Sequence, residues 1–315
     1  MSSLSSRVPW PLRLGARRVA RAASSAGRAL GAAGGRSAEP TTFRGETLDW
    51  SLAGTTLEVV LHREPCNEIG PATLDELERL ARLVRKGAGG ARALLIHSAV
   101  PRGFCAGADL WALHDGLTER KAAAGPRAWR RLGDAAEVRS FLDRIHRVFD
   151  TLDAAPITTI AATHGFCFGG GFELALTADV IVADKSTRFA FPELRLGLVP
   201  GFGGIPRLRR DLGNAVVRDL LLTGRSVPAA KAHHLGLVSQ VTARGEALRV
   251  ARLVAEQAAR FDPETTRAAK RFLKPIPRAE LEREKDLFIE LLASPTVERA
   301  LDKFVHSSDV RPYLP

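Results

Sequence analysis

Short apolar runs alternate with segments of helical periodicity along most of this chain, and this alternation constrains the fold more than any other feature. Residues 56–62 and 93–97 have the composition of strands, and the segment between them carries leucines and alanines at helical spacing. Further strand candidates at residues 157–163 and 180–183 flank a helix that begins in a glycine-rich segment. Strands that alternate with helices in this way predict an α/β domain.

The last part of the chain, from about Leu248, has a different pattern. Its helical segments have broad apolar faces, which indicates buried packing and also suits contact between subunits. We therefore predict a core over residues 41–247 and a C-terminal helical oligomerisation region over residues 248–315. The predicted breaks between these helices fall at Pro263, Pro275, Pro277 and Pro295.

Three glycine-marked segments stand out between the predicted elements. Residues 103–109 (GFCAGAD) follow a strand, and Asp109 suits the N-cap of a helix. Residues 164–175 (HGFCFGGGFELA) lead from a strand into a helix, so the main-chain N–H groups of their glycines should be unpaired and suit an oxyanion. Residues 191–204 (FPELRLGLVPGFGG) form a similar approach with a carboxylate at its entrance.

Each of these segments alone is a weak indication of function. Glycine triplets occur in ordinary tight turns, and a glutamate in the first turn of a helix often only complements the helix dipole. The combination is far more specific. The motifs FCAGADL, HGFCFGGGFELALTADVIVAD and FPELRLGLVPGFGG, in this order and spacing, make residues 50–310 resemble the crotonase (enoyl-CoA hydratase/isomerase) superfamily.

This resemblance implies both a fold and a reaction. The fold expected is a crotonase-like spiral of ββα turns with a helical C-terminal region, assembled as a homotrimer or a hexamer. The reaction expected is that of an enoyl-CoA hydratase, which adds water reversibly to a 2-enoyl-CoA thioester and gives 3-hydroxyacyl-CoA in fatty acid metabolism. Since coenzyme A is part of the substrate, no separate cofactor is expected.

Four residues carry the catalytic roles that the resemblance implies. The main-chain N–H groups of Cys105 and Gly170 correspond to the oxyanion hole, which stabilises negative charge on the thioester oxygen. The family glutamates fall on Glu173 and Glu193, which we assign to the attacking water and to the proton at the α-carbon, respectively. The thiol of Cys105 is expected to be a small packed group rather than a nucleophile.

The coenzyme A and acyl sites are less well defined by sequence. Arg63 suits either a phosphate or solvent, and Phe168, Phe172, Phe202 and Trp111 suit either an acyl channel or the core. Residues 62–69 and 201–208 depart from the family pattern, which leaves acyl preference open. The substrate-binding residues predicted by the resemblance are Arg63, Ala106, Gly107, Ala108, Asp109, Leu110, Gly169 and Phe202.

Other functions remain as alternatives. Related enzymes isomerise, hydrolyse or decarboxylate acyl thioesters, or act on acyl groups linked to a carrier protein. A different class, an RNA-binding or structural paralogue without turnover, is suggested by the formal net charge of +11. Residues 1–40, with seven arginines and one acid, account for +6 of this charge, so the remaining chain is modestly basic and nucleic-acid binding is not expected.

Composition also bears on the compartment. Three separated cysteines without CxxC spacing and eight dispersed histidines predict neither disulfides nor a metal site, and no stretch is apolar enough to cross a membrane. Residues 1–40 are rich in arginine, serine and alanine, which is typical of a mitochondrial transit peptide and would place the protein in the matrix. A disordered bacterial leader on a cytoplasmic protein is the alternative, and it is favoured because arginine predominates over lysine throughout the chain.

Overall fold

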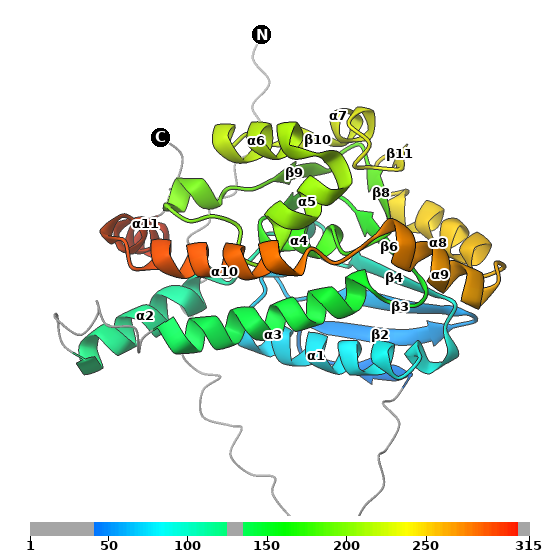
Figure 1. The fold of residues 1–315 in the computed structure, drawn as a ribbon, viewed down its shortest axis with the longest axis horizontal. Coiled ribbons are helices and arrows are strands. Elements are labelled where there is room, and N and C mark those ends of the chain that lie inside the picture. Colours follow the sequence, from blue (N-terminus) through cyan, green and yellow to red (C-terminus); the bar gives the residue numbers. More distant parts are fainter. Residues whose placement is uncertain (1–40, 125–134, 308–315) are drawn as a thin grey trace, which may run out of the picture.

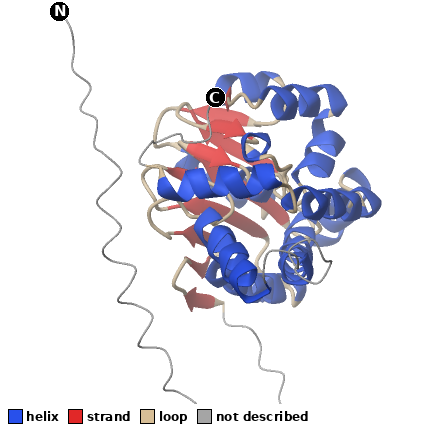
Figure 2. Cartoon of the chain, turned by 90° about the vertical axis from the view of Figure 1, so that its left-hand side faces the viewer, coloured by secondary structure: helices blue, strands red, loops and turns tan. Residues whose placement is uncertain are grey.

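Two β-sheets of different size form the centre of the fold, and helices surround them (Figures 1 and 2). The computed structural model describes residues 41–124 and 135–307. The predictions for residues 1–40 therefore lie outside the described part of the chain. The large sheet has the strand order β1-β2-β3-β4-β6-β8-β11, and the small sheet has the order β10-β9-β7-β5.

The strands divide between the two sheets in a regular way. Along the chain, each of β4, β6 and β8 in the large sheet is followed at once by β5, β7 or β9 in the small sheet, and then by helices. Within each sheet these strands are parallel neighbours. The chain therefore winds as a spiral of ββα turns, and this prediction is confirmed. The strands are β1 (Thr42–Arg44), β2 (Leu48–Ala53), β3 (Thr56–Leu61), β4 (Ala93–Ser98), β5 (Gly103–Cys105), β6 (Thr158–Thr163), β7 (Phe166–Phe168), β8 (Val180–Asp184), β9 (Arg188–Ala190), β10 (Val227–Pro228) and β11 (Gln240–Thr242).

The helices include the one predicted between the first two strands, which is α1 with its apolar stripe buried. Pro263 and Pro295 stand at the first positions of α9 and α11, and Pro275 and Pro277 lie between α9 and α10, as their breaking effect predicts. The helices are α1 (Pro71–Arg85), η3 (Ala88–Gly90), α2 (Leu110–Ala124), α3 (Ala135–Asp153), α4 (Gly170–Ala175), η5 (Glu193–Leu196), α5 (Gly204–Leu212), α6 (Asn214–Thr223), α7 (Ala229–His234), α8 (Ala247–Ala258), α9 (Pro263–Leu273), α10 (Arg278–Leu292) and α11 (Pro295–His306).

Both faces of the large sheet are covered, and strand β4 shows how. Leu94 and Ile96 point into the main core, whereas Ala93 and Leu95 pack with the alanines of helix α8 on the opposite face. Side chains alternate across a strand, so a run that is apolar at every position suits a strand buried on both sides. This explains why residues 93–97 are recognisable as a strand without polar alternation.

The C-terminal helices α10 and α11 pack against helices that follow the strand pairs of the spiral. Helix α10 crosses α3 and α5, and α11 contacts α2 and η5 (Figure 1). The helical C-terminal region predicted from sequence is therefore present, although its role in oligomerisation stays a prediction. Within residues 41–124 and 135–307, no helix is long and apolar enough to cross a bilayer.

Candidate active site

Two of the glycine-marked segments meet at one edge of the small sheet. Strands β5 and β7 are parallel, so the segments that follow them leave the sheet at the same edge. A Cβ atom at Gly171 would lie 2.6 Å from Cβ of Cys105, and one at Gly107 would lie 3.1 Å from the amide nitrogen of Gly170. The glycines are therefore required because the two backbones approach too closely for side chains.

At this junction the main-chain N–H groups of Ala108 and Gly170 are unpaired within residues 41–124 and 135–307. The N–H of Ile69 donates to the carbonyl of Gly107, and the carbonyl of Ile69 accepts from the N–H of Asp109. The N–H of Ala108, which lies between these two residues, therefore points away from Ile69. Gly170 is the first residue of α4, where an N–H has no partner within the helix. Neither amide has a hydrogen-bond partner among the described residues, and a Cβ at Gly170 would lie 3.4 Å from the nitrogen of Ala108.

Cys105 lies elsewhere in this arrangement. The family motif predicts its N–H as the partner of Gly170, but Cys105 is in strand β5, opposite Cys167 of β7, and packs beneath Gly171. Its thiol donates to the carbonyl of Asn67 at 2.9 Å, and burial raises its pKa to about 12. This environment suits the packed thiol that was predicted. Cys66, Cys105 and Cys167 are buried, and none of them forms a disulfide bond.

Glu173 stands in the first turn of α4 and is almost completely buried. Its Oε1 accepts hydrogen bonds from the N–H groups of Phe202 and Gly204, each at 2.8 Å. Burial raises the pKa of Glu173 to about 7, because a charge without water around it is unfavourable, and the two N–H donors oppose this rise. The carboxyl group is thus fixed in direction and poised to exchange a proton near neutral pH.

Glu193 begins η5, and its side chain lies next to Gly169, which precedes α4. A Cβ at Gly169 would lie 2.6 Å from its Oε1, and its Oε2 is buried without a hydrogen-bond partner in the described part of the chain. Burial, followed by the charge of Glu173, raises the pKa of Glu193 well above its usual value. The two predicted glutamates, together with Gly169 and Gly170, are therefore brought to one place.

The turn formed by residues 201–205 supports Glu173 with a pattern that sequence analysis did not reveal. Its successive N–H groups alternate between two carboxylates: Phe202 and Gly204 donate to Glu173, whereas Gly203 and Ile205 donate to Glu284 of α10, at 2.7 and 2.9 Å. Glu284 is itself buried, so two buried glutamates bind this turn, and one of them was not among the predicted site residues. The available signal was an acid on the apolar face of a helix, between Leu281 and Phe288.

The carbonyl groups of the turn are paired as well. Nε2 of His146 donates to Gly201 at 2.8 Å, and Nη1 of Arg207 donates to Phe202 and Gly203 at 3.2 Å each. Burial lowers the pKa of His146 to about 3, so the ring is neutral at physiological pH and its Nε2 carries the proton donated to Gly201. The turn is therefore held through both its donors and its acceptors.

The predicted substrate-binding residues of the 103–110 segment lie beside the unpaired amides and would form one wall of a substrate site there. Asp109 caps helix α2 as predicted, because its Oδ1 accepts from the N–H of Ala112 at 3.0 Å. Arg63 donates to Oδ2 of Asp109 at 2.7 Å and to the carbonyl of Glu68 at 2.6 Å. Its guanidinium is thus part of the wall. The N–H of Ala106 bonds to Cys66, and Leu110 begins α2 and packs against the core.

A cavity of about 330 Å³ adjoins these residues between α2 and α3; we call it the α2/α3 cavity. Ala108 and Phe202 line it, which connects it to the unpaired amides and to the turn that binds Glu173. The other predicted channel residues are not among its lining: Phe172 is fully buried between Phe189 and Phe191, which makes it core. Most of the remaining lining is apolar: Ile69, Leu113, Leu117, Val138, Phe141, Leu142 and Phe288.

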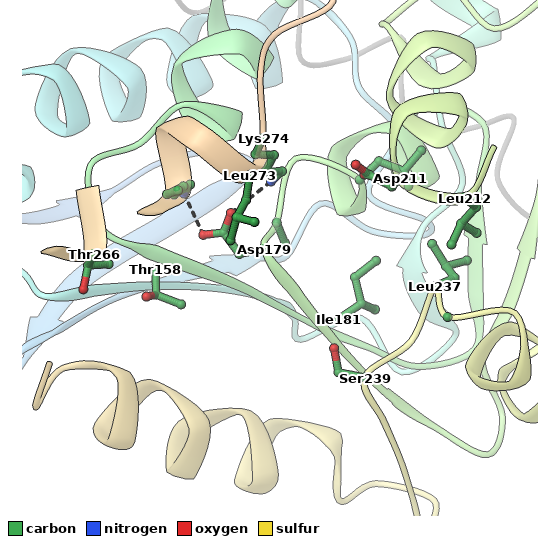
Figure 3. A pocket seen from close by; sticks show the side chains of 14 residues that line it. Thr158, Asp179, Ile181, Asp211, Leu212, Leu237, Ser239, Thr266, Leu273 and Lys274 are labelled. Carbon is green, nitrogen blue, oxygen red and sulfur yellow. Dashed lines mark hydrogen bonds and ion pairs between the residues drawn. The ribbon is translucent and has the colours of Figure 1, made fainter. Parts of the chain in front are cut away.

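A second cavity, of about 350 Å³, lies beside helix α9, and we call it the α9 cavity (Figure 3). Its two lysines are paired with aspartates: Lys270 lies 2.6 Å from Asp179, and Lys274 lies 3.1 Å from Asp179 and 2.9 Å from Asp153. Neither Glu173 nor Glu193 lines either cavity, but the α9 cavity shares no lining residue with the α2/α3 cavity and includes neither Ala108 nor Phe202. The α9 cavity is thus separate from the site around the glutamates.

Known proteins give an independent comparison. The family model described as enoyl-CoA hydratase/isomerase matches residues 53–310. The chain is 33% identical over 264 residues to carnitinyl-CoA dehydratase of Proteus mirabilis, covering 84% of this chain and 92% of that protein. It is 38% identical over 191 residues to mouse enoyl-CoA hydratase domain-containing protein 2, mitochondrial, covering 60% of this chain and 58% of that protein. The solved enoyl-CoA hydratase of Bacillus anthracis is 26% identical, with a TM-score of 0.62 over 82% of this chain and 96% of its own.

Proposed function

Since this chain belongs to the enoyl-CoA hydratase/isomerase family, we propose that it is an enoyl-CoA hydratase that adds water to 2-enoyl-CoA thioesters. The observation that carries this proposal is the convergence of two buried carboxyl groups and two unpaired main-chain N–H groups at one junction. Hydration needs one group to take a proton from water and another to protonate carbon, whereas the thioester oxygen needs donors. All four groups are supplied without a separate cofactor.

In this proposal the thioester carbonyl oxygen lies between the N–H groups of Gly170 and Ala108. The second donor is Ala108 rather than Cys105, because the Ala108 amide is the unpaired one that approaches Gly170. Both donors would strengthen their hydrogen bonds as the thioester oxygen gains negative charge. One such donor contributes about 3–4 kcal/mol of transition-state stabilisation.

The environments of the two glutamates support different roles. Glu173 receives two N–H donors, which favour its carboxylate form, so we assign it to the proton of the attacking water. Glu193 has a buried oxygen without a partner among the described residues, and both burial and the charge of Glu173 raise its pKa, so its protonated form is favoured and we assign it to the proton at the α-carbon. It would deliver this proton to the α-carbon while the water oxygen bonds to the β-carbon. The roles reverse in the dehydrating direction.

The α2/α3 cavity is the proposed place for the acyl chain. It is mainly apolar and is lined by Ala108 and Phe202, which belong to the oxyanion donor segment and to the turn. The coenzyme A moiety would extend over the segment around Arg63 and residues 106–110. A homotrimer or hexamer, and either a cytoplasmic or a mitochondrial location, remain proposals, the latter suggested by the names of relatives such as the mouse protein.

The relative named as a dehydratase favours addition and elimination of water over the other reactions of the family. Isomerisation needs a proton to be moved between carbons, which one carboxylate can do, so a second acid is a specific requirement of hydration. Two acids close enough to affect each other's pKa are present in this chain. Isomerase activity is therefore the second candidate.

The test is hydration of crotonyl-CoA, followed as loss of the absorbance of the conjugated enoyl thioester. Glu173→Gln and Glu193→Gln should each lower kcat by at least about 10²-fold, because each removes one proton-transfer group. Gln keeps the size of the side chain, so melting temperatures close to that of wild type would exclude loss of the fold. Wild-type rates from either variant would refute the proposal.

A further inference from the structure

Helix α10 places a third buried acid, Glu284, against the turn that binds Glu173. On the proposed function, we infer that Glu284 is a positioning residue for catalysis: it holds the 201–205 turn in the conformation in which both Phe202 and Gly204 reach Glu173. Glu284 does not touch the substrate site in this proposal. It acts on the reaction through the turn and through Glu173.

The alternation of hydrogen bonds is the first observation that supports this role. Gly203 and Ile205 donate to Oε1 and Oε2 of Glu284, and the two N–H groups at the intervening positions donate to Oε1 of Glu173. The carboxylates therefore hold the turn from two sides. If the Glu284 side is released, the peptide planes of the turn can rotate, and the N–H groups that reach Glu173 rotate with them.

The packing around Glu284 is the second observation. One face of α10 covers the turn with Leu281, Glu284 and Phe288, which lie at helical spacing. A Cβ at Gly203 would lie 2.8 Å from Leu281, and one at Gly201 would lie 2.6 Å from the ring of Phe288. The turn is thus enclosed, and water cannot readily replace Glu284 as an acceptor for the two N–H groups.

The energetic cost of this arrangement is the third observation. Burial and the charge of Glu173 both disfavour the carboxylate of Glu284, whose pKa is raised well above its usual value. A buried acid of this kind contributes little to stability compared with an apolar side chain. Arg207, which bonds the carbonyls of the same turn, partly offsets the charge. An orienting role explains why an acid occupies this position between Leu281 and Phe288 on the buried face of the helix.

The test uses Glu284→Gln and a matched control, Glu282→Gln. Glutamine has one acceptor oxygen, so one of the two N–H groups loses its partner. Glu282 lies on the same helix, but it is exposed and pairs with Arg139 and Lys285. Glu284→Gln should lower kcat for crotonyl-CoA about 10-fold or more with KM changed less than about 3-fold, whereas Glu282→Gln should leave both unchanged.

A double-mutant cycle separates positioning from a general structural effect. If Glu284 acts through Glu173, adding Glu284→Gln to Glu173→Gln should leave kcat within about two-fold of the Glu173→Gln value. A further fall by the full factor seen in the wild-type background would overturn the inference. Full kcat in Glu284→Gln alone would overturn it as well.

Hydrogen exchange provides a readout that does not depend on activity. Amides in the peptide covering residues 199–208 should exchange faster in Glu284→Gln than in wild type and Glu282→Gln; unchanged exchange contradicts the inference. If wild-type protein hydrates no enoyl thioester, the proposed function fails, and exchange alone decides whether Glu284 holds the turn. If Glu284→Gln does not fold, Glu284→Asp, which keeps both oxygens but withdraws them by one methylene, is used in the same measurements.

Discussion

The α2/α3 cavity and the α9 cavity have nearly the same volume, about 330 and 350 Å³, yet they differ in the state of their polar groups. In the α9 cavity, Lys270 and Lys274 are paired with aspartates. Beside the α2/α3 cavity, by contrast, the N–H groups of Ala108 and Gly170 and one oxygen of Glu193 have no partner among the described residues.

The difference indicates which kind of cavity can do chemistry. Paired charges have already been stabilised by the protein, so a ligand gains little by replacing them, whereas unpaired buried groups are costly until a ligand satisfies them. The α9 cavity therefore has the character of a structural ion-pair network that attaches α9 to the core. The region of the glutamates retains unsatisfied groups, which is what a site specific for a developing charge requires.

The largest effect that would test this contrast is a loss of stability in Asp153→Asn. Asp153 is fully buried and lies 3.0 Å from Nε of Arg207, 2.9 Å from Nη1 of Arg210 and 2.9 Å from Lys274. Removing its charge leaves three cations without their shared partner, so we expect the free energy of unfolding to fall by about 3–5 kcal/mol. Urea denaturation measures this change, and a loss below about 1 kcal/mol would show that the network is not structural.

A smaller effect, a gain rather than a loss of stability, is expected for Glu173→Gln when pH is varied. Burial raises the pKa of Glu173 to about 7 from an ordinary value of 4.5, so its protonation stabilises the fold below pH 4.5 and this contribution is lost as pH rises through 7. Glu173→Gln should therefore become more stable relative to wild type between pH 4.5 and 7. Unfolding curves at several pH values measure this difference.

Asp153 provides the contrasting case in the same experiment. Burial would raise the pKa of Asp153, but Lys274, Arg207 and Arg210 together lower it below its ordinary value of 3.8. Its contribution to stability is present above pH 3.8 and is lost as pH falls through the folded-state pKa. The loss of unfolding free energy in Asp153→Asn relative to wild type should stay constant from pH 5 to 8. If the stabilities of both variants, relative to wild type, changed with pH in the same direction, the assigned environments would be contradicted.

Sequence and structure agree where the signal is local. The apolar run of β4 and the stripe of α1 follow from periodicity, and Glu173 and Glu193 follow from the motifs that contain them. These features depend on residues that are neighbours in the chain. Such local patterns are sufficient to predict the α/β class and the positions of the two acids.

Contacts between distant segments could not be predicted in this way. Along the chain, Glu284 is about 80 residues from Gly203, whose N–H donates to it, and Arg207 is more than 50 residues from Asp153. The choice of Ala108 over Cys105 as the proposed second donor depends on local geometry: Gly107 has a φ of 109°, which turns the backbone just before the Ala108 amide. A motif identifies such a loop, but the direction of each N–H depends on dihedral angles that the letters do not specify.

Filling each cavity with a larger side chain should produce the smallest but most selective effect. Leu117 lines the α2/α3 cavity and Leu237 lines the α9 cavity, so Leu117→Phe and Leu237→Phe add the same bulk to the two sites. If the α2/α3 cavity holds the acyl chain, Leu117→Phe should lower the ratio of kcat/KM for a C10 enoyl-CoA to that for a C4 enoyl-CoA about 10-fold. The added ring would displace a few methylene groups of the longer chain, and losing their contacts with the pocket costs at least about that factor. Leu237→Phe should leave this ratio within about two-fold. Equal effects of the two variants, or a change in the Leu237→Phe ratio alone, would mean that the acyl chain does not occupy the α2/α3 cavity.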